Sequence, residues 1–216
     1  NMSNRLKKMR EWLVEHDLDG VLISSDENRK YLSGFAGSAG YLIVSRDEAV
    51  LFTDFRYIEQ ASKQAPDFRV ERISGDVKWL VEFALEKGLQ RVSFESQHLT
   101  FHMYSLLKKA IGEVDNGSID LVGMPEVVDS MRATKYEEEM TLLEKAIAIT
   151  DYALEKVSET LEPGITEREI AWQLEKTMRE RGADGLAFDT IVASGPNGAL
   201  PHHSPSDRPI MKDEPV

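Results

Sequence analysis

Two hydrophobic patterns divide this chain, and the change between them limits the folds that it can adopt. Up to Gly123-Met124-Pro125, short apolar runs alternate with segments whose apolar residues recur at helical spacing. Residues 136–160 then keep helical spacing without any such run. Alternating strands and helices are typical of a sheet covered by helices. The sequence therefore predicts an α/β domain in residues 2–124 and a second domain, opened by helices, in residues 125–216.

The first domain is predicted to hold a mixed sheet flanked by helices. Helical spacing from Leu6 to His16 indicates a first helix, which the Asp19-Gly20 pair ends. Residues 40–45 and 49–53 are apolar runs joined by a short charged segment, most simply a hairpin. Further strands are expected at residues 21–23, 68–73, 91–94 and 119–122, and further helices at residues 57–64, 77–87 and 99–111.

The second domain contains a helix start after Pro163-Gly164. Thr166 and Glu169 have the S/T-x-x-E spacing of a capping box, and Gly182 is a suitable stop for the helix. Residues at four-residue spacing are predicted to form its buried face, namely Ile170, Leu174 and Met178.

A histidine pair follows a turn near the end of the sequence. Branched residues make residues 188–194 a strand by composition, and Gly195-Pro196-Asn197-Gly198 requires a sharp turn. That turn leads to His202 and His203. Spacing alone leaves two interpretations open, either exposed loop side chains or groups delivered to a site at a strand end.

Several motifs, in order, resemble the aminopeptidase P, prolidase and creatinase family. YLSGFAGSAG (31–40) and LFTDFRY (51–57) resemble its creatinase-type N-terminal domain. M-R-x-x-K-x-x-x-E from Met131, L-x-P-G-x-T-E-x-E-I-A from Leu161 and F-D-T-I-V-A-S-G-x-N-x-A-x-P-H from Phe188 resemble the start of its pita-bread catalytic domain. The resemblance implies an α/β N-terminal domain followed by the first helices and strand of an incomplete α+β pita-bread domain.

The family resemblance also implies a metal-dependent peptidase that cleaves the bond between an N-terminal residue and proline, as an Xaa-Pro dipeptidase or aminopeptidase. Its members use two divalent ions, commonly manganese or cobalt, held by two Asp, one His and two Glu. By this resemblance the first metal-binding Asp would follow Val216. We therefore expect a full-length enzyme to bind two ions, and these 216 residues to bind none and to be inactive alone.

No substitute metal site is expected within the sequence. Glu137, Glu138 and Glu139 are consecutive, so on a helix their side chains spread around the axis and cannot face one ion. His98 and His102 have the i, i+4 spacing that can place two imidazoles on one helix face, but an acidic third ligand is not nearby. A solvent-exposed helix face is therefore the better interpretation for the three glutamates and for the two histidines.

Three site residues are predicted from the resemblance. His202 matches the family histidine that hydrogen-bonds the substrate or the tetrahedral intermediate, and imidazole is suited because it can be charged or neutral near pH 7. His203 competes for that role and is a candidate for substrate binding. Arg56 can hydrogen-bond a peptide carboxylate, although an ion pair with Asp54 is the commoner use of such an arginine.

Charge and composition exclude other function classes. A net charge of -12 opposes binding to a phosphate backbone, so nucleic acid is not an expected partner. No apolar run approaches the length of a membrane span, so no membrane association is expected. The lack of cysteine is compatible with a reducing cytoplasm, the expected location. The expected partners are a proline-containing peptide and, by resemblance, a second copy in a homodimer.

Two function classes remain open. The alternative to the peptidase is a non-catalytic pita-bread protein that binds peptides or histones, because an acidic surface suits basic partners. His202 favours the enzyme, since a pure binding module does not need it. In the family the helix of residues 136–160 packs on a curved sheet that is mostly absent here. We therefore expect an exposed apolar face, and either self-association or a longer polypeptide.

Overall fold

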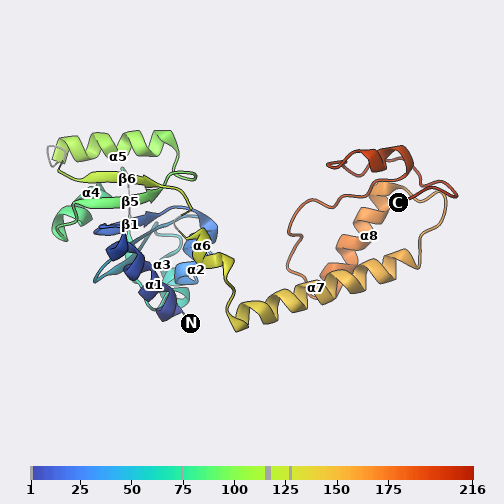
Figure 1. Cartoon of the computed structure of the whole chain (residues 1–216), viewed down its shortest axis with the longest axis horizontal. Helices are drawn as coiled ribbons and strands as arrows, with labels where there is room; N and C mark the ends of the chain where they lie inside the picture. Colours follow the sequence, from blue (N-terminus) through green and yellow to red (C-terminus); the bar gives the residue numbers. More distant parts are fainter. Residues whose placement is uncertain (1, 74, 115–117, 127) are drawn as a thin grey trace. The chain divides into compact units, whose positions relative to one another are not determined.

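The chain folds into two compact units, the first ending at Thr134 and the second beginning at Lys135. The structure is a computed structural model that describes residues 2–73, 75–114, 118–126 and 128–216. Figure 1 shows a sheet with helices in the first unit, and α7 beside α8 in the second. Among the described residues, no helix combines the length and the hydrophobicity needed to cross a bilayer.

Six strands and six helices of the first unit are assigned in the described residues. The helices are α1 (Met2–Glu15), α2 (Asp26–Ser33), α3 (Ile58–Gln64), α4 (Lys78–Glu86), α5 (Phe101–Val114) and α6 (Asp129–Ala133). The strands are β1 (Gly20–Ile23), β2 (Tyr41–Ser45), β3 (Ala49–Thr53), β4 (Arg69–Arg72), β5 (Arg91–Glu95) and β6 (Asp120–Met124). All strands and helices predicted in this region are present within a few residues of their expected ends, whereas α2 and α6 were not predicted.

The strands form one sheet in the order β4-β3-β2-β1-β5-β6. Pairs β1/β2 and β2/β3 are antiparallel, while β1/β5, β5/β6 and β3/β4 are parallel, so the predicted mixed sheet is confirmed. The predicted hairpin is β2-β3, in which Leu42 pairs with Leu51 and the Ser45 N–H donates to the Glu48 carbonyl at 2.9 Å.

Both faces of this sheet are buried, and successive strand residues point to opposite faces. On one side Leu22, Ile43 and Phe52 share a buried cluster with side chains of α4 and α5. Alternate residues such as Val21 and Leu42 are also buried. Burial on both sides explains why these strands read as continuous apolar runs. On α1 the predicted face is buried as far as Leu13, but His16 lies beyond the helix end and is exposed.

The division between the units lies C-terminal to the boundary predicted after residue 124. Contacts of α6 explain the difference. The Tyr31 hydroxyl donates to the Met131 carbonyl at 3.2 Å, and Arg132 Nη1 donates to Asn28 Oδ1 at 3.0 Å. These bonds attach α6 to the first unit.

The second unit is built on α7 (Glu137–Ser158) and α8 (Glu167–Glu180), the two helices predicted there. Its core is small and consists of Ala153, Val157, Ile170, Leu174, Val192 and Ile210. The capping box is formed, since the Thr166 N–H donates to Glu169 Oε2 at 2.8 Å and the Glu169 N–H donates to Thr166 Oγ1 at 3.2 Å. Gly182 has a positive φ of 103°, as a glycine after a helix end permits.

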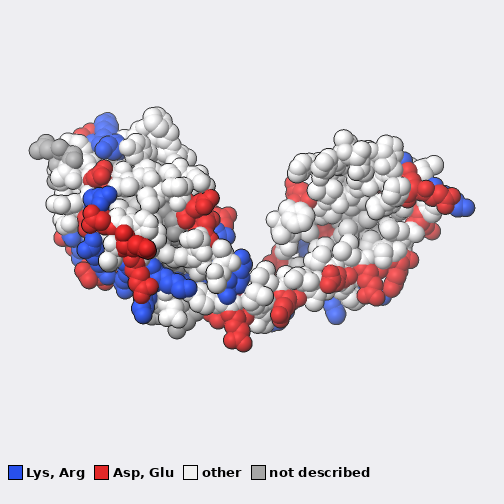
Figure 2. All heavy atoms as spheres, viewed as in Figure 1, with Lys and Arg blue, Asp and Glu red and all other residues white. Residues whose placement is uncertain are grey.

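Much of the apolar surface of α7 is exposed, as expected from the sequence. The exposed side chains are Met140, Leu142, Leu143, Ile147 and Leu154. Red spheres of acidic residues lie along the lower edge of the second unit in Figure 2. The exposed glutamates of α7 include Glu137, Glu138, Glu144 and Glu155. This helix contributes an acidic face of the kind that the net charge of -12 indicated.

The strand predicted at residues 188–194 does not form. Ser194 has extended backbone angles, φ -112° and ψ 143°, but the segment pairs with no strand in the described part of the chain. Composition indicates an extended backbone, whereas a strand also requires a partner for its N–H and C=O groups. The Ser194 N–H instead donates a hydrogen bond to the side chain of Glu167. The predicted turn follows as a 3-10 helix at Gly195–Ala199.

Candidate functional site

The two predicted histidines border a hollow in the second unit. The hollow has a volume of about 650 Å³ and is lined by residues 188–191 and 202–205. His202 is exposed, whereas the side chain of His203 is only 11% exposed. The turn after Gly195 therefore brings both imidazoles beside residues 188–191, although not at the end of a strand.

Glu167 lies beneath this histidine turn, with 0% of its surface exposed. It is the first residue of α8. Its Oε1 accepts hydrogen bonds from the N–H and hydroxyl of Ser194, at 2.8 and 2.9 Å, and from Asn197 Nδ2 at 2.9 Å. Its Oε2 accepts from His203 Nε2 at 2.7 Å and from the N–H and hydroxyl of Ser206, at 3.0 and 2.7 Å. One carboxylate thus joins two separate stretches of the loop that carries the histidines, residues 194–197 and residues 203–206.

This environment favours the ionised carboxylate. Burial alone raises the pKa of Glu167, but the hydrogen bonds donated by Ser206, Asn197, His203 and the Ser194 N–H outweigh it and hold the pKa far below its ordinary value. The position at the N-terminus of α8 is also favourable for negative charge. Because a carboxylate only accepts hydrogen bonds, His203 Nε2 carries the proton in this contact.

Backbone hydrogen bonds fold the end of the loop against the start of α8. The Glu167 N–H donates to the Arg208 carbonyl at 3.1 Å, and the Arg168 N–H donates to the Ser206 carbonyl at 3.1 Å. Arg208 then binds Glu214 through two parallel bonds of 2.6 Å and reaches the Ser194 hydroxyl at 2.6 Å. The orphan N–H groups of a helix start are thereby paired with the loop that carries the histidines.

The predicted site residue Arg56 belongs to the first unit and contacts Asp54. Its Nε and Nη2 donate to the two Asp54 oxygens at 2.9 and 2.7 Å. The hydrogen bond from Arg56 lowers the pKa of Asp54. The structure therefore contains the Arg56–Asp54 ion pair, the commoner use expected of such an arginine.

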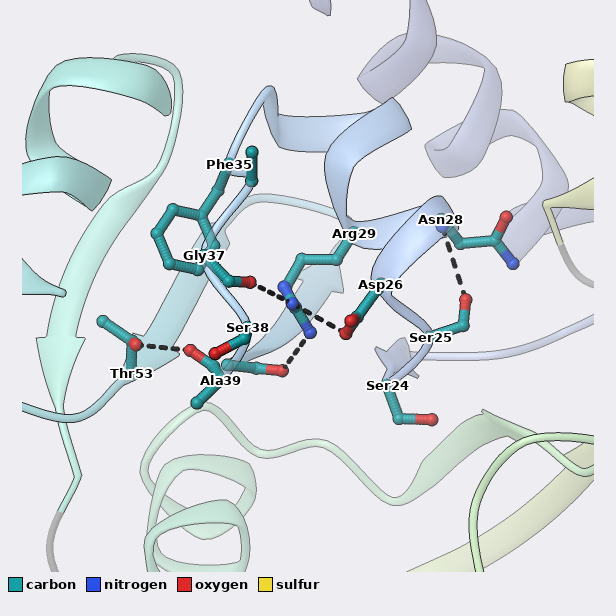
Figure 3. A network of polar contacts seen from close by, with 12 residues as sticks. Ser24, Ser25, Asp26, Asn28, Arg29, Phe35, Gly37, Ser38, Ala39 and Thr53 are labelled. Atoms are coloured by element: carbon teal, nitrogen blue, oxygen red, sulfur yellow. Dashed lines mark hydrogen bonds and ion pairs between the residues drawn. The ribbon is translucent and has the colours of Figure 1, made fainter. Parts of the chain in front are cut away.

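The glycine-rich loop of residues 34–40, also in the first unit, is held by a buried arginine that the sequence analysis does not predict as a site residue. Arg29 Nη1 donates to the Gly40 carbonyl at 2.9 Å, and Nη2 donates to the Gly37 carbonyl and to Asp26 (Figure 3). Thr53 Oγ1 also donates to the loop, at the Ala39 carbonyl. The loop is thus fixed from beneath by a side chain with five rigid donors.

A second buried carboxylate, Glu95, lies at the end of β5. It accepts hydrogen bonds from the N–H groups and hydroxyls of Ser24 and Ser25 and from the Asn28 amide. Burial raises the pKa of Glu95, but the bonds from Asn28, Ser25 and Ser24 lower it below its ordinary value. All of these donors come from the turn into α2.

Metal ligands are not gathered in the described part of the chain. No group of three or more His, Asp or Glu side chains there is placed to hold an ion. His98 precedes α5, with Nδ1 3.1 Å from Ser24 Oγ, and so does not share a helix face with His102. The residues present therefore do not fit the metal pair of a metallopeptidase by themselves.

Comparison with known proteins gives a consistent result over the whole chain. Residues 5–134 match the creatinase/prolidase N-terminal domain, and residues 141–216 match metallopeptidase family M24. The chain is 37% identical over 207 residues to YqhT, an uncharacterized peptidase of Bacillus subtilis, with 95% of this chain and 57% of YqhT covered.

Solved structures show the same similarity. An Xaa-Pro dipeptidase from Bacillus anthracis matches with a TM-score of 0.92 and 33% identity, over 99% of this chain and 59% of that one. The N-terminal domain of the cytoplasmic peptidase PepQ from Mycobacterium tuberculosis matches with a TM-score of 0.55 and 38% identity, over 59% of this chain and 98% of that domain. The chain thus spans less than two thirds of the two longer relatives.

Proposed function

Because this chain belongs to the creatinase/prolidase family of metallopeptidases, we propose that the complete protein containing it hydrolyses the bond between an N-terminal residue and proline. The reaction is that of an Xaa-Pro dipeptidase or aminopeptidase. The match along 99% of the chain to an Xaa-Pro dipeptidase is the observation that carries the proposal. The placement of His202 and His203 at a hollow supports it.

In this proposal His202 is the catalytic residue contributed by the chain. It is exposed at the hollow, so its ring can donate a hydrogen bond to the peptide carbonyl as negative charge develops there. Proline lacks an N–H and has a fixed φ, which calls for a dedicated site. His203 is assigned to substrate binding only through its contribution to the hollow. Arg56 is a weaker candidate for a peptide carboxylate, because Asp54 already takes two of its donors.

The cofactors belong to the proposal for the complete protein. The metallopeptidase family implies divalent metal ions, and we assign two, manganese or cobalt. Since the described residues gather no cluster of ligands, the role proposed for this chain is to bind and orient the peptide and, through His202, to donate a hydrogen bond to its carbonyl.

The direct test is hydrolysis of Ala-Pro by the complete protein and its His202→Ala variant. We expect the turnover number to fall by about 10²–10⁴-fold with metal content unchanged. His102→Ala, which removes an exposed histidine of α5, is the matched control and should leave turnover unaltered. Equal turnover of His202→Ala and wild type would remove the assignment. Binding of Ala-Pro peptides without cleavage by the wild type would favour the non-catalytic alternative.

We also propose a homodimer and a cytoplasmic location. The family resemblance supports the homodimer, and a related N-terminal domain comes from a peptidase named as cytoplasmic. Light scattering of the complete protein tests the first point, with a dimer expected and a monomer contradicting it. Cell fractionation tests the second.

A further inference from the structure

Glu167 has more hydrogen bonds than the start of a helix requires. The α8 N-terminus already has a capping box, made by Thr166 and Glu169. The six donors on Glu167 come instead from the loop, at Ser194, Asn197, His203 and Ser206. A fully buried carboxylate with three donors on each oxygen fixes all of those groups at once.

Among these donors His203 is the one next to the proposed catalytic residue. Its Nε2–H points to Glu167, which leaves only Nδ1 available for other contacts. Its backbone N–H donates to the Leu200 carbonyl at 3.2 Å, so the residue is held at both ring and backbone. A fixed His203 restricts the backbone angles of the turn and therefore the place of its neighbour, His202.

We propose that Glu167 is a positioning residue of the peptidase site, which acts through His203. It holds the His203 ring as the Nε2–H tautomer and joins residues 194–197 to residues 203–206, so that His202 faces the hollow. The reaction in this inference is that of the proposed function, on which the inference rests. The choice of Glu167 rests on its hydrogen bonds. A carboxylate that orients an imidazole is a common way to fix the tautomer that a site needs.

A double-mutant cycle in the complete protein tests whether Glu167 acts through His203. Glu167→Gln keeps the size of the side chain but not its charge, and His203→Ala removes the ring. We expect each to lower the turnover number for Ala-Pro, by up to about 10²-fold, with a smaller change in KM. The double variant should be no slower than the slower single variant. Glu169→Gln, a carboxylate in the same turn of α8 that makes the capping box, is the matched control and should retain turnover.

Two results would overturn the positioning role of Glu167. Losses that multiply in the double variant would show that Glu167 acts independently of His203. Unchanged turnover in a folded Glu167→Gln protein would also overturn the proposal. If that variant does not fold, His203→Ala, which removes the ring that Glu167 holds, decides in its place. Turnover should fall with the fold retained, and unaltered turnover would contradict the role.

A nitrogen-15 NMR measurement on the histidine rings separates this inference from the proposed function. In the wild type, His203 Nε2 should carry a proton in a hydrogen bond to Glu167, and Glu167→Gln should change the nitrogen-15 signal of Nε2 while Glu169→Gln does not. A wild type that cleaves no Xaa-Pro peptide would refute the proposed function, yet the NMR spectrum would still report on Glu167. An identical spectrum in wild type and Glu167→Gln would refute the positioning role itself.

Discussion

The two units each bury a carboxylate, but the carboxylates organise different amounts of structure. Glu95, 4% exposed, binds donors within one short segment, residues 24–28, at the start of α2. Glu167, 0% exposed, binds two stretches of loop, residues 194–197 and residues 203–206, that lie 27 to 39 residues away in sequence. The first unit has a large apolar core around its sheet, whereas the second has six buried apolar residues in its cluster. Because the apolar core of the second unit is small, polar contacts hold the loop that carries His202 and His203 in place.

The largest effect on stability is expected in the apolar core of the first unit. Phe52, 5% exposed, lies against Trp79 and Phe83 with ring centroids 4.6 and 5.5 Å apart. Phe52→Ala should lower the free energy of unfolding by about 3–5 kcal/mol. Urea denaturation measures it, with Phe101→Ala, at an 83% exposed position, as a control expected to change stability by about 0.5 kcal/mol or less. Similar losses in both variants would contradict the core described for the sheet.

Replacing either buried carboxylate should lower the free energy of unfolding by less than Phe52→Ala does. Each replacement should affect the region around its own carboxylate. Glu95→Gln and Glu167→Gln each leave buried donors without their acceptor, a loss of about 1–3 kcal/mol. Hydrogen exchange is expected to increase around Ser24 and Asn28 in the first variant. In the second it should increase from Ser194 to Ser206. Exchange that spreads evenly through both units in either variant would show that the carboxylates do not act locally.

Acid should weaken both carboxylate clusters. The pKa of Glu95 and of Glu167 is lowered in the folded protein, against about 4.3 for an unperturbed glutamate. A lowered folded pKa gives stability that is complete above the unfolded value and is lost as the pH falls below it. Unfolding measured from pH 7 to pH 3 should therefore show a steeper loss for the wild type than for Glu167→Gln. Parallel curves would contradict the expectation.

The smallest effect is expected at the surface. Arg56 and Asp54 form a two-bond ion pair in which the arginine is well exposed. Such exposed pairs contribute little to stability, so Arg56→Ala should leave the urea midpoint of unfolding nearly unchanged. A peptide-binding assay on the same variant tests the other proposed use of Arg56. Weaker binding with an unchanged fold would support a substrate contact, and unchanged binding would leave only the ion pair.

The sequence predicted best where local pattern and packing agree. Strands buried on both faces appeared as apolar runs, and the capping box marked the start of α8. Helix α2 was missed because its eight residues are mostly polar, although Ser25 is a recognisable N-cap. The strand at residues 188–194 was wrong because composition does not supply a pairing partner. The two compact units divide after Thr134, C-terminal to the predicted boundary, because the attachment of α6 depends on contacts with Tyr31 and Asn28.

The candidate site was predicted only in part. The motif resemblance singled out His202 and His203, and the structure places both at one hollow. Glu167 is not predicted as a site residue and stands only within the family motif that begins at Leu161, because an acidic residue in the first turn of a helix is common. Its burial depends on His203 and Ser206 folding back over it. The polar residues Ser194, Asn197 and Ser206 around the turn were the available signal, but spacing could not show that they share one acceptor.

Variants of the two buried carboxylates give the most direct test of the role of Glu167 in positioning the turn that carries His202 and His203. Ala-Pro turnover should be measured for Glu95→Gln and Glu167→Gln in the complete protein, at a temperature where both are folded. Glu167→Gln is expected to be slower than wild type by up to about 10²-fold, and Glu95→Gln to match the wild type. Equal turnover of the two variants would contradict the claim that the second unit uses its buried carboxylate to set the histidine turn.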